Sequence, residues 1–573
     1  MIKKTRHSGF ALSAITLVGA NRRRGPSSAS HGTNSFYGVI NIITHESGAG
    51  EGASVSVTGG YAADASARFG GSGEQWDYRL SVGHRSDAGM DNGFFNDHNA
   101  TNVINLRSNY HLNASDTFEV QFGNSNGVYG AGLAGRLDSF FRDITSKSEF
   151  QQLGWSHLWA NNDETKLIYS HTAKSSIDPL KCIGMSDCDT NPSTYYKQYA
   201  GSAQRNEIEL QNTHQLGDHN RFVWGGGTRG DYTENALVFS HAQKINTWQV
   251  FAHDEWRITD AAIINIGTMY EDNGMGSRNS SPRAALNYHL TPQQTVRFGI
   301  STATRSASLA EAYVEANNKI FGGVYIQPIK PLTPEKIVSK EIAYLGDFQS
   351  IGVTLDARAY IDQVTDMIFT DLYPRAPLEE SSVKNMMTAD FKGLEATVKY
   401  HWDEKHSFLS FNYAYQEASA HFVNYPTQFY NPTPFGSGTI GSFIRNVYLN
   451  NDQYPSRFNQ IVPTHSYSVL ISEQLADSWQ LSAGYYYRGE VRAIAIAPDI
   501  PPEYQMSRLD LRLAKTFKFD GAKSAEIAMV VQNVTQDNYN TFDVLGWKLN
   551  KDNAQRSSLT FPRRAWITAI FSF

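Results

Sequence analysis

The sequence is poor in charged residues and in long hydrophobic runs. Lys, Arg, Asp and Glu together make up 18% of its 573 residues, below the quarter that is usual in soluble proteins. After the first twenty residues, no uninterrupted apolar run approaches the ~18 residues that a membrane-spanning helix needs. The net charge is −6, with acidic and basic residues interspersed, so no basic stripe indicates a nucleic-acid partner. The composition therefore excludes a helical membrane protein and does not favour a nucleic-acid-binding one.

Cysteine is almost absent. Cys182 and Cys188 lie in a polar, turn-rich stretch with five residues between them. A zinc site needs about four ligands, and no further Cys or His lies nearby in the sequence. The remaining interpretations are a small disulfide loop, formed in an oxidising compartment, and a pair of free thiols. We expect the disulfide, at the tip of a long extracellular loop, and no bound metal or cofactor.

Aromatic residues and glycine, by contrast, are abundant. Phe, Trp and Tyr make up 12% of the chain, and there are 45 glycines, a mixture that favours strands and tight turns over helices. From about residue 52 to the C-terminus, apolar and polar residues alternate with the period of two that is typical of a strand. In segment 394–402, Leu, Ala, Val, Tyr and Trp alternate with Glu, Thr, Lys and His. Each such strand has one apolar face and one charged face.

This alternation fits two architectures, a soluble sandwich and a membrane barrel. In a sandwich the apolar face meets a second sheet, whereas in a barrel it meets lipid and the charged face lines the lumen. Three features favour the barrel. The strands are long, often about eleven to fourteen residues against five or six in soluble proteins, short turns alternate with long loops, and the chain ends on an amphipathic strand at Phe573. A terminal Phe on such a strand resembles the signal that the bacterial barrel-insertion machinery reads, so this machinery is an expected partner.

The sequence thus predicts an all-β fold, a large antiparallel transmembrane β-barrel of about 22 strands. A barrel of this size carries an internal plug. An even number of strands places both ends of the barrel segment on the same side of the membrane. The candidate strands cover residues 52–61, 64–72, 75–86, 101–112, 115–126, 147–160, 163–174, 204–216, 219–232, 245–258, 260–272, 280–290, 293–304, 336–347, 350–363, 388–402, 405–418, 462–475, 478–490, 505–518, 523–535 and 562–573.

The first residues resemble an export signal. Basic residues at positions 3, 4 and 6 precede the apolar run 10–19, which is too short to span a bilayer, and Val18-Gly19-Ala20 is an acceptable cleavage motif. The alternative is a fortuitous leader on a truncated gene. We therefore predict a signal-peptide-like leader over 1–20, and the strand pattern places the barrel over 51–573.

The most specific segment is Arg24-Gly-Pro-Ser-Ser-Ala-Ser-His-Gly-Thr-Asn-Ser-Phe-Tyr-Gly-Val-Ile-Asn-Ile-Ile-Thr44. It resembles the end of the plug domain of TonB-dependent outer-membrane receptors, in which Arg-Gly-Pro, a later Gly and Gly-Val-Ile-Asn-Ile-Ile-Thr recur. Gly25, Gly32 and Gly38 permit tight turns. The run Val39–Ile43 is expected to form a buried plug strand.

Four stretches of the predicted barrel are similar to motifs of the same family. Together with the plug motif they extend the resemblance over residues 24–573. The sequence departs from the family pattern before Arg24, where an energy-coupling box and most of a plug are usual. The resemblance therefore implies only a short plug-domain remnant, over residues 21–50, inside the barrel. The four stretches are Ser281-Pro-Arg-Ala-Ala-Leu286, Arg305-Ser-Ala-Ser-Leu-Ala-Glu311, Leu332-Thr-Pro-Glu-Lys-Ile-Val-Ser-Lys-Glu341 and Gln532-Asn-Val-Thr-Gln-Asp-Asn-Tyr539.

The resemblance implies an uptake receptor of the bacterial outer membrane rather than an enzyme. Members of this family typically take up ferric siderophores, less often haem, cobalamin or sugars, and import is energised through the TonB complex. The sequence contains no catalytic constellation. Two alternative functions remain open. The first is a passive, porin-like channel or a non-functional remnant of a truncated receptor. The second is a surface attachment protein.

Two sets of residues are candidates for function. In the receptors that this chain resembles, the plug arginine at the position of Arg24 meets barrel glutamates at the positions of Glu341 and Glu395. Alternation places both glutamates in the lumen, and a guanidinium can engage two carboxylates through its fork of donors. The second set belongs to an aromatic and basic loop that either stacks on a planar, anionic chelate or packs on itself. Its candidate binding residues are Tyr425, Phe429, Tyr430, Arg445 and Tyr448.

Overall fold

The fold is seen in a computed structural model of the chain. The residues that the structure describes are 17–24, 26, 28–32, 35–44, 47–48, 52–89, 96–132, 141–179, 200–235, 238–314, 316–318, 324–328, 331–371, 381–402, 407–423, 458–460, 462–475, 478–492, 503–521, 523–535, 540–543 and 558–573.

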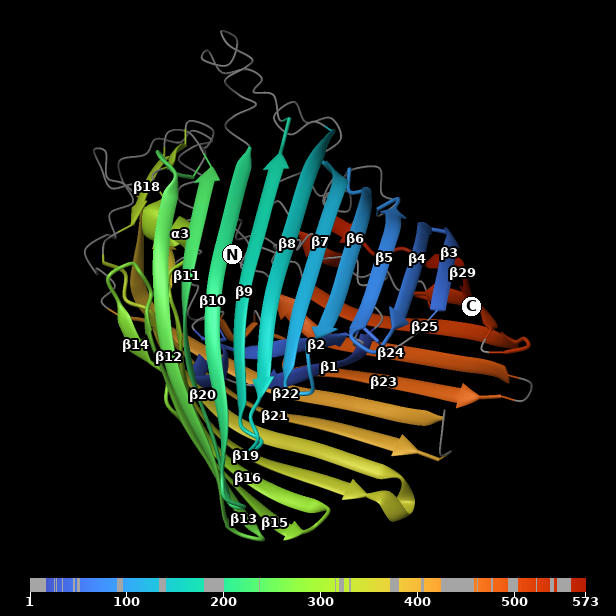
Figure 1. The fold of residues 1–573 in the computed structure, drawn as a ribbon. Coiled ribbons are helices and arrows are strands. Elements are labelled where there is room, and N and C mark those ends of the chain that lie inside the picture. The colour runs from blue at the N-terminus through green and yellow to red at the C-terminus, as the bar shows by residue number, and fades with distance from the viewer. Residues whose placement is uncertain are drawn as a thin grey trace.

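The described residues form a closed wall of 22 antiparallel strands (Figure 1). Two further strands, β17 and β18, lie in the excursion between β16 and β19, and β14 and β15 are two parts of one wall strand. The wall strands are β3 (Gly52–Gly60), β4 (Ala62–Ser72), β5 (Trp76–Asp87), β6 (Asn99–His111), β7 (Asp116–Ala131), β8 (Arg142–Leu158), β9 (Glu164–Ile177), β10 (Gly201–Leu216), β11 (Asn220–Asn235), β12 (Gln243–Thr259), β13 (Ala262–Asp272), β14 (Arg278–Ser280), β15 (Arg283–Thr291), β16 (Gln294–Arg305), β19 (Glu335–Phe348), β20 (Val353–Asp371), β21 (Ser381–His401), β22 (Phe408–Phe422), β23 (His465–Gln474), β24 (Trp479–Arg492), β25 (Glu503–Lys518), β26 (Ser524–Gln532) and β29 (Arg564–Ser572).

A few short elements lie outside this wall. They are β1 (Leu17–Arg24), α1 (Ser28–His31), β2 (Gly38–Thr44), α3 (Leu309–Tyr313), β17 (Ala316–Asn318), β18 (Val324–Pro328), η3 (Gln349–Ile351), η5 (Phe458–Gln460), β27 (Asn540–Asp543) and β28 (Ser558–Thr560). Among the described residues, no helix combines the length and the hydropathy that crossing a bilayer requires.

The prediction of a 22-strand barrel is confirmed, and every candidate strand corresponds to an observed one. The largest errors are at the β20–β21 hairpin, where β20 ends at Asp371 and not at 363, and β21 begins at Ser381 and not at 388. The register shifts between Val364 and Met367, and Asp366 has a φ of 57°. A bulge of this kind breaks the period-two pattern, so the sequence could not show that the strands continue.

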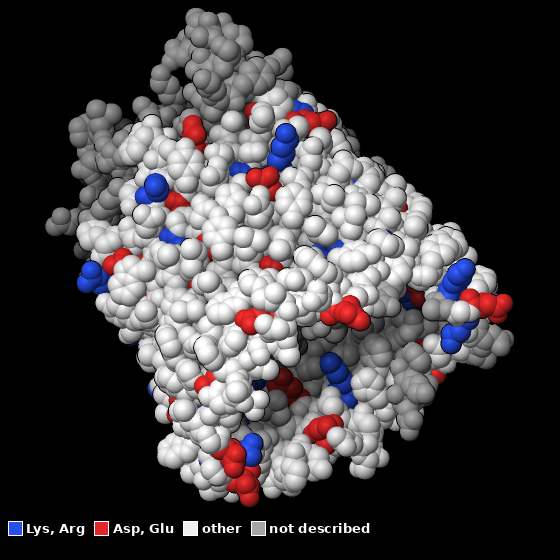
Figure 2. All heavy atoms as spheres, in the orientation of Figure 1, with Lys and Arg blue, Asp and Glu red and all other residues white. Residues whose placement is uncertain are grey.

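The two faces of the wall differ as the alternation predicts. Leu394, Tyr400, Leu481 and Leu513 are exposed on the outer face, and most of the visible outer wall carries no charge, with charged side chains gathered near its ends (Figure 2). Exposed tryptophans lie toward both ends of the wall, as in the aromatic girdles of outer-membrane barrels. Trp76, Trp159, Trp256 and Trp402 lie at the end with the short turns, and Trp248 lies toward the other end. The outer face is therefore built to meet lipid, with short turns toward the periplasm and long loops outside the cell.

The strands β1 and β2 lie inside the barrel (Figure 1). β1 pairs antiparallel with β2, from Leu17 opposite Thr44 to Arg24 opposite Gly38. β1 thus overlaps the last four residues of the leader-like segment, and the leader stays a prediction. The β2 strand was predicted correctly, but the prediction that it is buried is wrong at Ile40, whose side chain is 71% exposed.

Candidate functional site

The candidate site is the lumen and the chain segment that occupies it, residues 26–48, called here the plug segment. At its start, Ser28 and Ala29 of α1 are buried against β13 and β16. Gly32 follows with a φ of 77°, and its amide donates to the Ser28 carbonyl at 3.0 Å. A Cβ at Gly32 would lie 3.1 Å from Gln249 Oε1. Glycine is required here because the backbone is left-handed and close to the wall.

The middle of the plug segment is held by an apolar cluster. Phe36 is only 2% exposed and packs among side chains from β16, β19, β20, β21 and β22. The ring of Phe458 lies 5.7 Å from that of Phe391 and belongs to the same cluster. The core residues are Phe36, Ala303, Ile337, Val364, Met387, Ala389, Phe391, Ala418 and Phe458.

The end of the plug segment contacts the opposite wall. Ser47 is buried, and its hydroxyl accepts a hydrogen bond from Asn109 Nδ2 of β6 at 2.8 Å. Gly48 lies against the carboxylate of Asp77 on β5. The plug segment therefore crosses the lumen, from the β13–β16 wall to the β5–β6 wall.

A network of charged side chains, centred on the buried Arg358, lies on the lumen side of β16, β19, β20 and β21. Arg358 Nε donates to Glu341 Oε2 at 2.6 Å, and Arg358 Nη1 lies 3.8 Å from Glu395 Oε2. Arg297 Nε lies 3.2 Å from Glu341 Oε1. The side chain of Arg358 is 4% exposed, so its charge is compensated by these carboxylates rather than by water.

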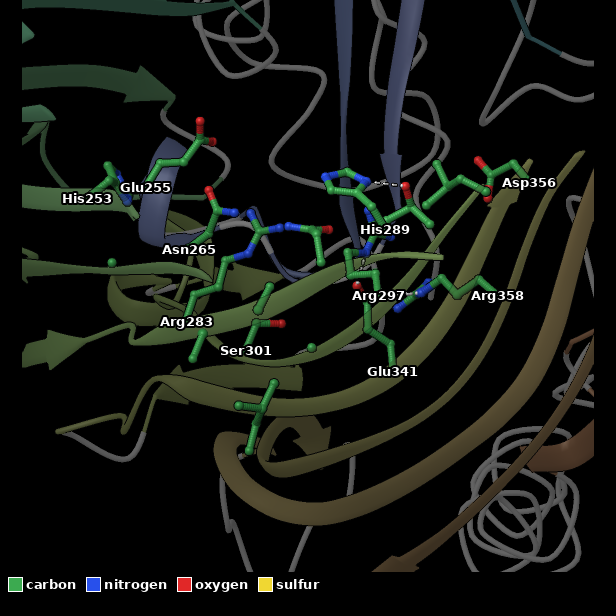
Figure 3. Close-up of a pocket in the computed structure, with 18 of the residues that line it drawn as sticks. His253, Glu255, Asn265, Arg283, His289, Arg297, Ser301, Glu341, Asp356 and Arg358 are labelled. Atoms are coloured by element: carbon green, nitrogen blue, oxygen red, sulfur yellow. Dashed lines mark hydrogen bonds and ion pairs between the residues drawn. The ribbon is translucent and has the colours of Figure 1, made fainter. Parts of the chain in front are cut away.

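The network borders a cavity of about 1360 Å³ in the half of the lumen near the short turns. Pro26 of the plug segment lines the same cavity. Figure 3 shows side chains from adjacent strands projecting into it, among them His289, Arg297, Glu341 and Arg358. The cavity is lined by both signs of charge and can hold water and polar groups.

The motif residues of the barrel meet at the long-loop end. The guanidinium of Arg305 binds the carboxylate of Glu335 with two bonds of 2.6 Å and that of Glu311 with bonds of 2.9 and 3.2 Å. The Ile368 amide of β20 donates to Glu335 Oε1 at 2.7 Å. Glu311 also closes a capping box with Ser308 at α3. Two separate sequence motifs are thus parts of one bidentate ion-pair cluster that fixes the start of the 306–334 excursion.

The structure places some of the predicted site residues and leaves others outside its described part. Glu341 and Glu395 both lie in the lumen, as alternation predicted, and they share Arg358. The backbone of Arg24 is in β1 opposite Gly38, but its side chain lies outside the described part, so its contact with the glutamates stays a prediction. Cys182, Cys188, Tyr425, Phe429, Tyr430, Arg445 and Tyr448 also lie outside the described residues.

Sequence reasoning missed Arg358, Arg297 and Phe36. Arg358 stands opposite Glu395 in the β20–β21 register and Arg297 stands near Glu341 across β16 and β19. Opposite charges on the lumen face of neighbouring strands could have predicted these two ion pairs from the sequence. Phe36 gave no such signal, because its partners come from five strands spread along the sequence. Within the described residues, no group of acidic, His or Cys side chains has the arrangement of a metal site.

Comparison with known proteins agrees with the fold and the motifs. The profile of the family described as TonB dependent receptor-like, beta-barrel, matches residues 44–561. The iron-regulated outer membrane virulence protein of Vibrio cholerae is 23% identical over 379 residues, which are 60% of this chain and 52% of that protein. The chain therefore spans about half the length of this relative.

Solved structures of siderophore receptors share the fold. The siderophore receptor PirA from Acinetobacter baumannii superposes with a TM-score of 0.75 at 13% identity, over 97% of this chain and 85% of that one. The ferripyoverdine receptor of Pseudomonas aeruginosa gives a TM-score of 0.70 at 14% identity, over 97% and 76% of the two chains. With the profile match over most of its length, the chain belongs to the TonB-dependent receptor family, and its wall is the outer-membrane β-barrel of that family.

Proposed function

We propose that this protein takes up a ferric siderophore across the outer membrane and that TonB energises the uptake. The observation that carries this proposal is the plug segment, which is anchored to the lumen at Gly32, Phe36 and Ser47. A barrel whose interior packs against such a segment is suited to gated transport, in which the segment shifts to open a path.

The substrate class rests on the relatives. One is iron-regulated, and others are receptors for ferric enterobactin and for ferripyoverdine. In this proposal the aromatic and arginine side chains of the 424–457 loop bind the chelate from outside, with Tyr425, Phe429, Tyr430, Arg445 and Tyr448 as the candidate contacts. Phe458 connects the end of that loop to Phe36, and so to the plug segment.

The test is uptake of radioactive iron by bacteria that carry or lack the gene, with one ferric siderophore at a time as the iron source. We expect gene-dependent uptake of at least one siderophore, which stops when TonB is depleted. Replacing Arg445 and Tyr448 with Ala should weaken uptake, whereas replacing the exposed lumen residue Arg221 with Ala should not. Equal iron uptake with and without the gene, for every siderophore, would refute the proposal.

The proposal includes an anchoring role for Arg24. Its guanidinium would join Arg358 and Arg297 in compensating Glu341 and Glu395. We expect Arg24→Ala to loosen the plug segment, measured as faster proteolysis between residues 26 and 48, with Arg24→Lys in between. Unchanged proteolysis of Arg24→Ala would remove Arg24 from the anchor.

The second candidate function is a passive channel, which the 1360 Å³ cavity near the short turns favours. A continuous water path should give the purified protein a large, persistent conductance in planar bilayers. TonB-independent uptake together with such conductance would support the channel over the energised receptor. A silent barrel would contradict the channel.

A further inference from the structure

The outer wall carries an apolar groove on strands β13, β15, β16, β19 and β20. Its volume is about 740 Å³. Ala284 and Ala359 form low points, and the bulky side chains of Phe298, Ile342 and Ile361 stand around them, all exposed. A second furrow of about 510 Å³ adjoins it and shares Ile266, Ala284 and Ile300. The paired furrows have the shape and chemistry to hold extended hydrocarbon chains.

A lysine stands at one edge of this groove. Lys340 lines the groove and is exposed, in register with Ile300 of β16 on one side and Ile361 of β20 on the other. These two isoleucines are 48% and 60% exposed, so the ammonium emerges from an apolar part of the wall. Among the described residues, Lys340 has no ion-pair partner, in contrast to the nearby Lys392, which lies 2.6 Å from Glu417. A cation in such surroundings is stabilised by an anionic group from the membrane.

The position of Lys340 selects the leaflet. β19 runs from Glu335 at the long-loop end to Phe348 at the short-turn end, and Lys340 lies in the half nearer the long loops. The groove residues Phe298 and Ile342 lie one row further toward the short turns. An ammonium group that reaches toward the headgroups therefore reaches the outer leaflet, while the groove extends below it into the acyl region.

We propose that this groove binds a phosphorylated, multiply acylated glycolipid of the outer leaflet, of the lipid A type. Two acyl chains lie in the furrows over Ala284 and Ala359, and a phosphate pairs with Lys340. The inference depends on the outer-membrane location of the barrel and does not depend on which substrate it transports.

The test uses the full chain reconstituted in phosphatidylethanolamine vesicles that contain a minor fraction of lipid A, with bound lipid counted by native mass spectrometry. Lys340→Gln should lower lipid A retention about fivefold, the effect of one surface cation on an anionic lipid. Ala284→Phe should lower it as well, by filling the groove. Lys515→Gln is the matched control, because Lys515 lies on the outer face over Trp479, near the short turns.

Two further lipids separate the contribution of the phosphate from that of the acyl chains. Lipid A without its phosphates should bind wild type and Lys340→Gln equally, and phosphatidylglycerol should bind more weakly than lipid A because it has fewer acyl chains. Heat-modified mobility on gels checks that each variant is folded. Equal retention of lipid A by wild type and Lys340→Gln, or an equal loss in Lys515→Gln, would overturn the proposal.

Discussion

The two halves of the lumen contact the plug segment through different kinds of interaction, apolar packing in one and a polar, charged cavity in the other. Toward the long loops, Phe36 is enclosed in an apolar cluster in which Ile337, Val364 and Ala389 have no exposed surface. Toward the short turns, Pro26 borders a cavity in which Arg358 and the glutamates form a charged network. Apolar packing is lost over short displacements, whereas charges in a polar cavity can exchange partners and water. The apolar half therefore fixes the position of the plug segment, whereas the charged half constrains it less tightly.

The largest expected effect comes from emptying the apolar half. Phe36→Ala should cost the docked state about 3–5 kcal/mol, so protease cleavage between residues 26 and 48 should be at least ~100-fold faster. Tyr37→Ala is the matched control, since the neighbouring ring is 57% exposed and its loss should change cleavage far less. If both variants are cleaved at the wild-type rate, the apolar half is not the anchor.

Next in size is the loss of the charged network. Arg358→Ala leaves Glu341 and Glu395 with fewer partners and should destabilise the barrel by about 1–3 kcal/mol, measured by urea unfolding in detergent. The cost is lower than for a dry ion pair because the cavity admits water. Arg358→Lys should recover part of it, and Arg221→Ala, an exposed arginine on the same cavity, should change little. An Arg358→Ala barrel as stable as wild type would show that the network contributes nothing.

A smaller effect is expected between the two halves, at Gly32. Gly32→Ala combines a left-handed backbone with a contact at 3.1 Å to Gln249 and should weaken docking by about 1–2 kcal/mol. The readout is again proteolysis of the plug segment. Gly217→Ala has a similar φ of 67° but an open environment in a short turn, so it should leave this proteolysis unchanged. An unchanged cleavage rate in Gly32→Ala would mean that this turn is not a fixed point.

The smallest effect concerns the short-turn rim, outside the lumen. Asp163 accepts hydrogen bonds from the ring of His214 at 2.7 Å and from the Gln215 amide at 2.9 Å, and these bonds lower the pKa of the Asp163 carboxyl. A lowered folded-state pKa stabilises the fold above the unfolded value of about 3.9, and this contribution disappears as the pH falls through the folded-state pKa. Asp163→Asn should therefore lower the urea midpoint slightly at pH 7 and match wild type at strongly acid pH.

The control for this pH dependence is Asp260→Asn, in another short turn, which should change the midpoint less at every pH. A difference between Asp163→Asn and wild type that persists at strongly acid pH would contradict the assignment.

The wall was predictable because a membrane barrel repeats one rule in every strand. Segment 394–402 alternates visibly, and its apolar residues do face outward. The lumen obeys no such rule. The Arg305 cluster joins Glu311 and Glu335 only because an excursion returns to the same wall position, and Phe36 finds partners that depend on the curvature of five strands. The alternation in the sequence shows whether a residue faces lipid or the lumen. Its partners inside the lumen depend on how the closed barrel brings distant strands together.

Closure itself constrains how the molecule is made. The wall is sealed by β29 against β3, where the hydroxyls of Thr58 and Thr568 lie 2.9 Å apart. The two wall strands that lie furthest apart in the sequence are thus the ones that pair, and the ring closes only when both are present. The plug segment precedes β3 in the sequence and lies within the finished ring, so it must already be on the inner side when the seam forms. Assembly of this barrel therefore also encloses the plug segment, which ends up inside the wall that closes around it.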